Sequence, residues 1–184
     1  MAKSYFQKAR KEYKCSKCGE TIRPKDGYYK IEAMYQSTKY RCEKCKPERS
    51  ELTGSEYYAW LWDLQDHLSE RYDLLTEDGK DELYSELDNM KDELQSRLDN
   101  MPEQLQYSET GELLQDRIDS IESAQSELDG VEYPDEDDYV VTDEDKEGLD
   151  EDDIETMKDE KETEYKDALD DCETTITDAI NNIE

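Results

Sequence analysis

The sequence predicts a mainly α protein with a small cysteine-rich β module at its N-terminus, followed by long acidic amphipathic helices in a bundle or coiled-coil-like arrangement. Four of the five cysteines fall in two CxxC pairs within the first 50 residues. Beyond them, apolar residues recur at spacings of three and four, which is typical of helices that bury one face. The charge of the chain changes sign at the same point, so the module and the helices form separate parts.

This charge is strongly segregated. Residues 1–50 hold 14 of the 23 Lys and Arg residues but only 6 of the 53 Asp and Glu residues, which makes them net +8, whereas the remaining 134 residues are net −38. Two parts with fields of opposite sign attract different partners. Adaptation to high salt would also give an acidic chain, but it should acidify the first 50 residues as well.

Composition limits the class of protein. Because 33% of residues are hydrophobic and 41% are charged, we expect thinly packed helices rather than a large compact core. No apolar run approaches the 18 residues or so of a membrane span, and no signal peptide precedes the CxxC pairs. These features predict a cytoplasmic protein with reduced cysteines and no membrane contact.

Within residues 1–50, alternating residues from Tyr28 to Tyr35 predict a β-strand, and the turn residues from Pro24 to Gly27 precede it. A second short strand is expected through Thr38 and Tyr40 into Cys42. Together the two strands would form a hairpin that carries the second CxxC pair.

Residues 51–130 are expected to form an acidic region of about three helices. A capping-box pattern at 53–56 opens the first, whose apolar stripe continues to Leu75. A break at 76–79 separates it from a second helix over 80–100, and Pro102 begins a third that Gly130 ends.

Residues 131–150 contain ten acidic residues and one lysine, with Pro134 and Gly148 as helix breakers. This composition predicts an acidic linker. The helical period returns over 151–184, which we expect to be one long C-terminal helix with Cys172 on its apolar stripe. His67, the one histidine, has no second base or nucleophile in its motif, so a helix surface or boundary position is expected.

The two CxxC pairs predict a metal centre in the basic module. One tight CxxC turn offers two sulfurs to one ion, and four thiolates complete the tetrahedron that zinc prefers. Cys15, Cys18, Cys42 and Cys45 are therefore expected to bind one structural Zn²⁺, which makes residues 1–50 a basic zinc-finger domain. The closed ligand set leaves no position for a substrate. No phosphate loop, catalytic triad or dinucleotide motif is present, and no enzymatic activity is expected.

Basic residues interleaved with Tyr5, Phe6 and Tyr13 surround the first CxxC pair. Such side chains can contact phosphates and stack on bases, which suggests contact with DNA or RNA. The same positive charge could instead dock on the acidic helices of the chain itself, and the sequence does not separate these two hypotheses. The candidate contact residues are Lys3, Lys8, Arg10, Lys11, Lys14 and Lys17.

The module resembles the zinc finger of poly(ADP-ribose) polymerases and some DNA ligases. The resemblance covers about residues 13–46, through Cys15-x-x-Cys18-x-x-x-Ile22, Gly27-Tyr-Tyr29 and Lys39-Tyr-Arg-Cys42-x-x-Cys45. It departs where Cys42 replaces the family's histidine ligand and Tyr40 replaces its tryptophan, so DNA-break sensing is not carried over. With residues 49–57, the finger also resembles uncharacterised proteins of bacteriophages and mobile elements, which implies a host cytoplasm as its setting.

The C-terminal helix is expected to approach the charge density of nucleic acid. Residues 151–184 hold fourteen acidic residues and three lysines, which gives about one net charge per ~4.6 Å along the helix, against ~3.4 Å for a DNA strand. Solvation of a thin helix also uses acidic residues, but it would normally intersperse Lys and Arg. The residues expected to imitate phosphates are Asp152, Asp153, Glu155, Asp159, Glu160, Glu162, Glu164, Asp167, Asp170 and Asp171.

Together these features favour a non-enzymatic, phage-type inhibitor that imitates DNA. Its expected partner is a basic nucleic-acid-binding host defence protein, either a nuclease or a CRISPR effector. The first alternative is a zinc-finger adaptor or transcription regulator that binds nucleic acid. The second is a structural protein whose helices form a homo-oligomer.

Overall fold

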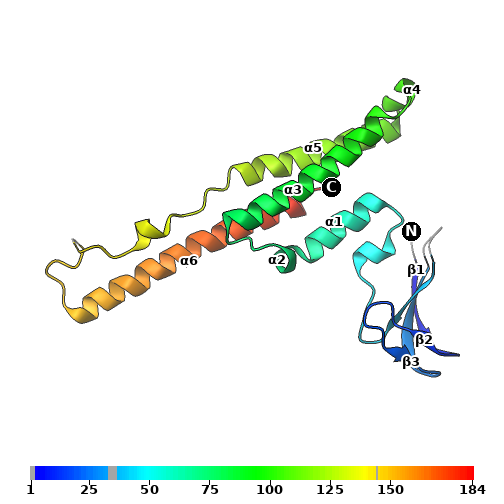
Figure 1. The fold of residues 1–184 in the computed structure, drawn as a ribbon, viewed down its shortest axis with the longest axis horizontal. Coiled ribbons are helices and arrows are strands. Elements are labelled where there is room, and N and C mark those ends of the chain that lie inside the picture. Colours follow the sequence, from blue (N-terminus) through cyan, green and yellow to red (C-terminus); the bar gives the residue numbers. More distant parts are fainter. Residues whose placement is uncertain (1–2, 33–36, 144) are drawn as a thin grey trace. The chain divides into compact units, whose positions relative to one another are not determined.

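The computed structural model describes residues 3–32, 37–143 and 145–184. The chain divides into two compact units, an N-terminal unit over Met1–His67 and a C-terminal unit over Leu68–Glu184. Each is described by itself below. Figure 1 shows the ribbon of both and labels α1–α6 and β1–β3.

The N-terminal unit begins with two small antiparallel sheets. The larger has the order β1-β4-β5, and the smaller pairs β2 with β3. Their core contains Ala9, Ile22 and Tyr28 together with two cysteines, and the rings of Tyr13 and Tyr40 stack with centroids 4.3 Å apart. The strands are β1 (Lys3–Lys8), β2 (Tyr13–Lys14), β3 (Thr21–Ile22), β4 (Gly27–Glu32) and β5 (Lys39–Cys42).

The predicted hairpin is confirmed, because β4 pairs antiparallel with β5 and Tyr28 lies opposite Cys42. Residues 33–35 of the predicted strand lie outside the described residues. Strand β1 was not expected from the basic N-terminal sequence. It pairs with β4, with Lys3 opposite Glu32 and Lys8 opposite Gly27. The two strands are far apart in sequence, so the local pattern of residues does not reveal this pairing.

A short 3-10 helix, η1 (Arg49–Leu52), leads into α1 (Glu56–Asp66). The side chain of Ser55 caps α1 by accepting a hydrogen bond from the N–H of Tyr58. The prediction of one helix reaching Leu75 was wrong. Helix α1 ends where His67 leaves helical geometry, with φ −125° and ψ 19°, and α2 (Leu68–Arg71) is a separate short turn in the next unit.

The C-terminal unit is built on α3 (Glu77–Asp99) and α5 (Glu109–Asp129), which lie side by side in Figure 1. The C-terminal part of α6 (Glu151–Asn181) packs against α5. One apolar face of each helix supplies the core. Its fully buried side chains include Leu83, Leu87, Leu94, Ile121, Leu128, Ile176 and Ile180.

Two glycines adjust the predicted helix starts. Residues 77–79 of the predicted break belong to α3, because the Thr76 side chain accepts a hydrogen bond from the Gly79 N–H at 3.2 Å and caps the helix three residues earlier than expected. The helix predicted from Pro102 is divided into α4 (Glu103–Gln106) and α5. Gly111 permits this division, since a Cβ there would lie 2.1 Å from the Gln106 carbonyl oxygen.

The acidic segment 131–150 packs on α6. It contains a 3-10 helix, η2 (Glu136–Tyr139), and the ring of Tyr139 lies 5.3 Å from that of Tyr165 on α6. Lys161 of α6 donates hydrogen bonds to the Val140 carbonyl at 3.2 Å and to the Asp145 carboxylate at 3.3 Å. These contacts hold the segment along the N-terminal half of α6.

The structure thus confirms a mainly helical chain with a small N-terminal sheet. Within the described ranges, no helix combines the length and the apolar character that crossing a membrane requires.

Candidate metal centre

The four cysteines of the CxxC pairs come together in the N-terminal unit. The sulfurs of Cys15, Cys18, Cys42 and Cys45 all lie within 4.8 Å of one another, and the Cys18 and Cys42 sulfurs are 3.8 Å apart. Sulfurs bound ~2.3 Å from an ion in a tetrahedron are separated by ~3.8 Å. The cluster therefore has dimensions that can hold a metal ion.

Each CxxC pair sits on a turn that a strand positions. Cys15 and Cys18 lie in the tight connection between β2 and β3. Two hydrogen bonds of 2.9 Å close this connection: the Gly19 N–H donates to the Cys15 carbonyl, and the Cys15 N–H donates to the Glu20 carbonyl. Gly19 has φ +72°, a conformation that favours glycine. Cys42 ends β5, and the Cys45 N–H donates to the Cys42 carbonyl at 2.9 Å.

The thiols of this cluster titrate unequally. Burial raises the pKa of Cys15, but backbone N–H groups of Cys18, Cys42 and Lys17 lower it further, and it falls from 9.0 to about 6. A hydrogen bond with Cys42, followed by burial, raises the pKa of Cys45 to about 12. The Cys15 thiolate thus forms readily, whereas Cys45 retains its proton. A cation among the sulfurs would offset the repulsion between neighbouring thiolates and favour loss of the remaining protons.

A buried arginine lies beside the cluster. Arg41 immediately precedes Cys42 and is 8% exposed, and its Nη2 forms an ion pair with the buried carboxylate of Glu51. Its Nε and Nη1 find no hydrogen-bond partner among the residues that the structure describes. The Cys15 sulfur also interacts electrostatically with this guanidinium. Arg41 therefore places positive charge where four thiolates and one divalent ion would sum to −2.

The predicted basic contact residues are mostly exposed. Lys8, Arg10, Lys11 and Lys14 are exposed, as is Phe6 on β1, at 55%. Lys17 is exposed as well, but its ammonium forms an ion pair with Glu48. The side chain of Lys3, at the start of β1, lies outside the described part of the chain.

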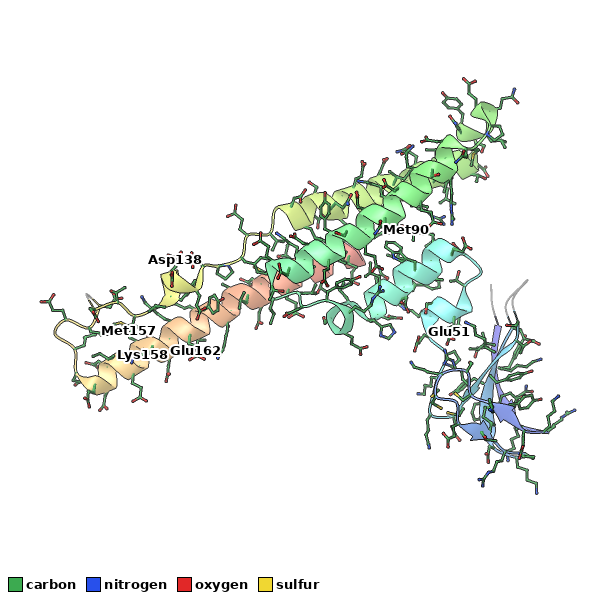
Figure 2. All side chains as sticks on the ribbon, viewed as in Figure 1. Glu51, Met90, Asp138, Met157, Lys158 and Glu162 are labelled. Atoms are coloured by element: carbon green, nitrogen blue, oxygen red, sulfur yellow. The ribbon has the colours of Figure 1, made fainter. Side chains whose placement is uncertain are left out.

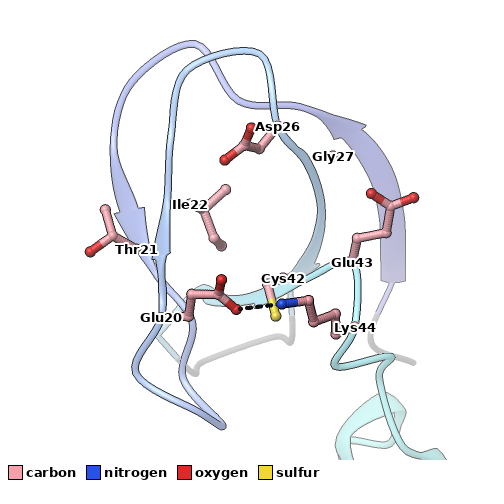
Figure 3. Close-up of a pocket in the computed structure, with 8 residues that line it drawn as sticks. All are labelled: Glu20, Thr21, Ile22, Asp26, Gly27, Cys42, Glu43 and Lys44. Atoms are coloured by element: carbon pink, nitrogen blue, oxygen red, sulfur yellow. Dashed lines mark ion pairs between the residues drawn. The ribbon is translucent and has the colours of Figure 1, made fainter.

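A pocket of about 300 Å³ opens beside the cluster, between the two small sheets (Figure 3). Ile22 and Cys42 contribute apolar surface to it, and an ion pair between Glu20 and Lys44, 3.6 Å apart, lies at its rim. Three carboxylates and one ammonium line this pocket, so its local charge is negative within a basic module. The remaining lining residues are Thr21, Asp26, Gly27 and Glu43.

All ten acidic residues predicted to imitate phosphates, from Asp152 to Asp171, are exposed on α6. Lys161 is directed toward the η2 segment, and Lys166 pairs with Glu162 at 2.6 Å. Figure 2 labels Lys158 and Glu162 on α6 and Asp138 on η2. Lys158 and Glu162 line a shallow groove of about 280 Å³ with Tyr139 and Tyr165.

Sequence reasoning missed a second group of side chains that could hold a metal ion. Glu48, Asp63 and His67 lie with their ligand atoms within 4.8 Å of one another. The spacing of four residues between Asp63 and His67 could have indicated this pair, because residues at that spacing share a face of a helix. The position of Glu48 near the pair depends on the tertiary fold, and the sequence alone does not predict it.

No family model matches the chain, and neither a curated protein nor a solved structure matches it. The functional argument therefore rests on the residues described above.

Proposed function

We propose that the chain is a non-enzymatic binding protein whose acidic helix α6 competes with nucleic acid for the basic groove of a partner. The observation that carries this proposal is the exposure of all ten acidic residues between Asp152 and Asp171. Over this stretch of ~30 Å, three lysines reduce the net charge to about one per ~4 Å, against ~3.4 Å for phosphates on a DNA strand. A rigid helix presents this charge at little entropic cost.

The partner is a nucleic-acid-binding protein with a positively charged channel. Complementary fields steer association and occupy sites that phosphates would otherwise fill. The resemblance of the finger to phage proteins favours a nuclease or a CRISPR effector, and the chain would then act as an inhibitor.

We further propose that the four cysteines hold one structural Zn²⁺. Four thiolates leave no open ligand position, and zinc is the ion that such sites most often bind. Removing the ion with a strong chelator should unfold the small sheets and change the fluorescence of Trp60 and Trp62, while the far-UV signal of the long helices persists. Metal analysis of the Cys42→Ser variant should give about one equivalent of zinc per chain less than the parent. Equal zinc in both would refute the four-cysteine site.

The competition proposal is tested by displacement of a fluorescent DNA duplex from purified nucleases and CRISPR effectors, followed by anisotropy. The full chain should displace the duplex from at least one of them, and the effect should weaken as salt rises. The test variant replaces six α6 acids by their amides: Glu155, Asp159, Glu160, Glu164, Asp167 and Asp170.

A matched control changes six exposed α5 acids in the same way: Glu112, Asp116, Asp119, Glu122, Glu127 and Asp129. It has the same net charge as the test variant, so it separates the α6 surface from charge in general. The α6 variant should lose about tenfold or more in potency and the α5 variant less than about threefold. An equal loss of potency in both variants would contradict a specific role of α6 and would mean that its acidic residues serve only to keep the helix solvated.

A nucleic-acid-binding adaptor is the second candidate. The observation in its favour is the exposure of Phe6 and Tyr5 beside Lys8, Arg10 and Lys11, since rings and cations together bind single strands. A mobility shift of the full chain at 50 and 200 mM salt distinguishes the two candidates. Tight binding of DNA or RNA that weakens with salt and is lost in Phe6→Ala would support the adaptor and oppose the competitor.

A further inference from the structure

A second group of ligand-bearing side chains lies in the N-terminal unit, outside the four-cysteine cluster. Glu48, Asp63 and His67 place two carboxylates and an imidazole within 4.8 Å of one another, measured between their ligand atoms. His67 Nε2 is 3.8 Å from Glu48 Oε2. We propose that these three residues bind a divalent transition-metal ion at a site separate from the cysteines.

Two of the three ligands lie at the C-terminal end of α1. Asp63 is in the last turn of the helix, and His67, four residues later, is the C-cap residue that follows Asp66. The backbone N–H of His67 donates to the Asp63 carbonyl at 3.2 Å, which fixes the spacing of the pair. Both side chains are half-buried, and a bound ion would therefore lie partly shielded from water.

The third ligand is held against this turn by an ion pair of its neighbour. Arg49, which follows Glu48, bonds the Asp66 carboxylate through Nη2 at 2.5 Å and through Nε at 3.1 Å. This bidentate contact joins η1 to the end of α1 with defined geometry. The position of Glu48 beside Asp63 and His67 is thus set by the fold rather than by a flexible loop.

The charges around the site suit a dication. Two carboxylates together supply a charge of up to −2, and the Lys17 ammonium forms an ion pair with Glu48. Lys17 neutralises part of this charge, but half of its side chain is exposed, so its ammonium can move into water when an ion arrives. A cation can therefore replace Lys17 without burying the displaced charge.

The donor set favours particular metals. Imidazole selects Zn²⁺, Co²⁺, Ni²⁺ and Cu²⁺ over Ca²⁺ and Mg²⁺, which prefer oxygen alone. Nitrogen and oxygen ligands in a tetrahedron at ~2.1 Å from the ion lie ~3.4 Å apart. The His67–Glu48 separation of 3.8 Å is close to this value, and the separations that reach up to 4.8 Å require side-chain rotation to close. Three protein ligands leave a position for water, unlike the closed set of four cysteines.

The test uses the full chain, loaded first with one equivalent of Zn²⁺ and then titrated with Co²⁺ in the presence of excess Mg²⁺. The excess Mg²⁺ is added to compete for any carboxylate-only binding of Co²⁺ on the acidic helices. Because His67 is the one histidine in the chain, its ring gives a single set of imidazole NMR signals. These signals should undergo large paramagnetic shifts that saturate at one equivalent of Co²⁺. No sulfur-to-cobalt charge-transfer band should appear, since the cysteines hold zinc.

Variants identify the ligands. Asp63→Asn and Glu48→Gln should each weaken Co²⁺ binding about tenfold or more, because even supporting residues of metal sites contribute this much. Glu56→Gln changes the same charge in the first turn of α1 and should leave affinity within about twofold. His67 signals in the parent chain that stay unshifted at millimolar Co²⁺ would overturn the proposal without reliance on any variant. Equal affinity in all three variants would also overturn it.

Discussion

At the scale of single residues, the most informative side chain is Arg41. Arginine is rarely buried, but Arg41 is only 8% exposed, and within the described ranges the carboxylate that it pairs with is that of Glu51. Glu51 also accepts a hydrogen bond from the Glu48 N–H at 3.3 Å. Arg41 thus connects the cysteine cluster to η1, and it compensates charge at both.

Removing one member of this pair should be costly. The Glu51→Gln substitution leaves the Arg41 guanidinium buried without a counter-charge, and we expect the free energy of unfolding to fall by about 2–4 kcal/mol. Urea unfolding followed by tryptophan fluorescence measures this in the N-terminal unit, because Trp60 and Trp62 both lie on α1.

Two further variants make this test specific. Glu43→Gln, at an exposed position, should change stability by less than about 0.5 kcal/mol. The double change Arg41→Met with Glu51→Met removes both charges and should recover much of the loss. A Glu51→Gln chain as stable as the parent would mean that the guanidinium is satisfied by water.

At the scale of elements, the helix starts depend on close backbone packing. The first turn of α3 lies so near the preceding chain that a Cβ on Gly79 would be 2.1 Å from the Asp73 carbonyl oxygen. Gly111 has the same role at the third position of α5, against Gln106. In both cases the glycine sits inside a helix, where propensity alone disfavours it by ~1 kcal/mol.

The Gly79→Ala substitution should therefore destabilise the C-terminal unit despite the higher helix propensity of alanine. The methyl group meets backbone rather than a movable side chain, and we expect a loss of about 1–3 kcal/mol. Thermal unfolding monitored by circular dichroism at 222 nm measures the effect.

Gly130→Ala is the matched control, since its added Cβ would come no nearer than 3.4 Å to the atoms around it. It should be neutral or slightly stabilising. If Gly79→Ala were equally neutral, the start of α3 would have room to shift, and the close approach would not be a constraint.

At the scale of the whole molecule, unpaired negative charge dominates. The chain carries 53 acidic and 23 basic residues, so most carboxylates repel one another without a basic neighbour. Added salt shortens the range of this repulsion from ~10 Å at 0.1 M to ~3 Å at 1 M. Surface ion pairs weaken at the same time, but each contributes little.

The melting temperature of the helices should accordingly rise with sodium chloride. We expect an increase of about 3 °C or more between 50 and 500 mM, measured by circular dichroism. The six-amide α6 variant, which has lost six of the repelling charges, should show a smaller increase. A melting temperature that falls with salt would mean that ion pairs outweigh repulsion in this chain.

Much of the fold follows from local pattern. The CxxC spacing predicted the cysteine cluster, the Pro24–Gly27 turn preceded the predicted strand, and the apolar periods predicted the helices now seen as α3, α5 and α6. The errors fall at boundaries. The helix expected to reach Leu75 stops at Asp66, and the helix expected from Lys80 begins at Glu77, with Thr76 as its N-cap.

The sequence by itself determined which chemical groups the protein carries and on which local elements they lie. These are four thiols in two turns, a basic module, and helices with acidic residues on their outer faces. These properties depend on residue type and short spacing, and local backbone geometry converts them directly into structure. Only the tertiary structure decided that β1 pairs with β4, that Arg41 is buried against Glu51, and that Glu48 meets Asp63 and His67. Each of these contacts joins residues from different elements, and their formation depends on packing and loop closure, for which a single sequence carries no periodic signal.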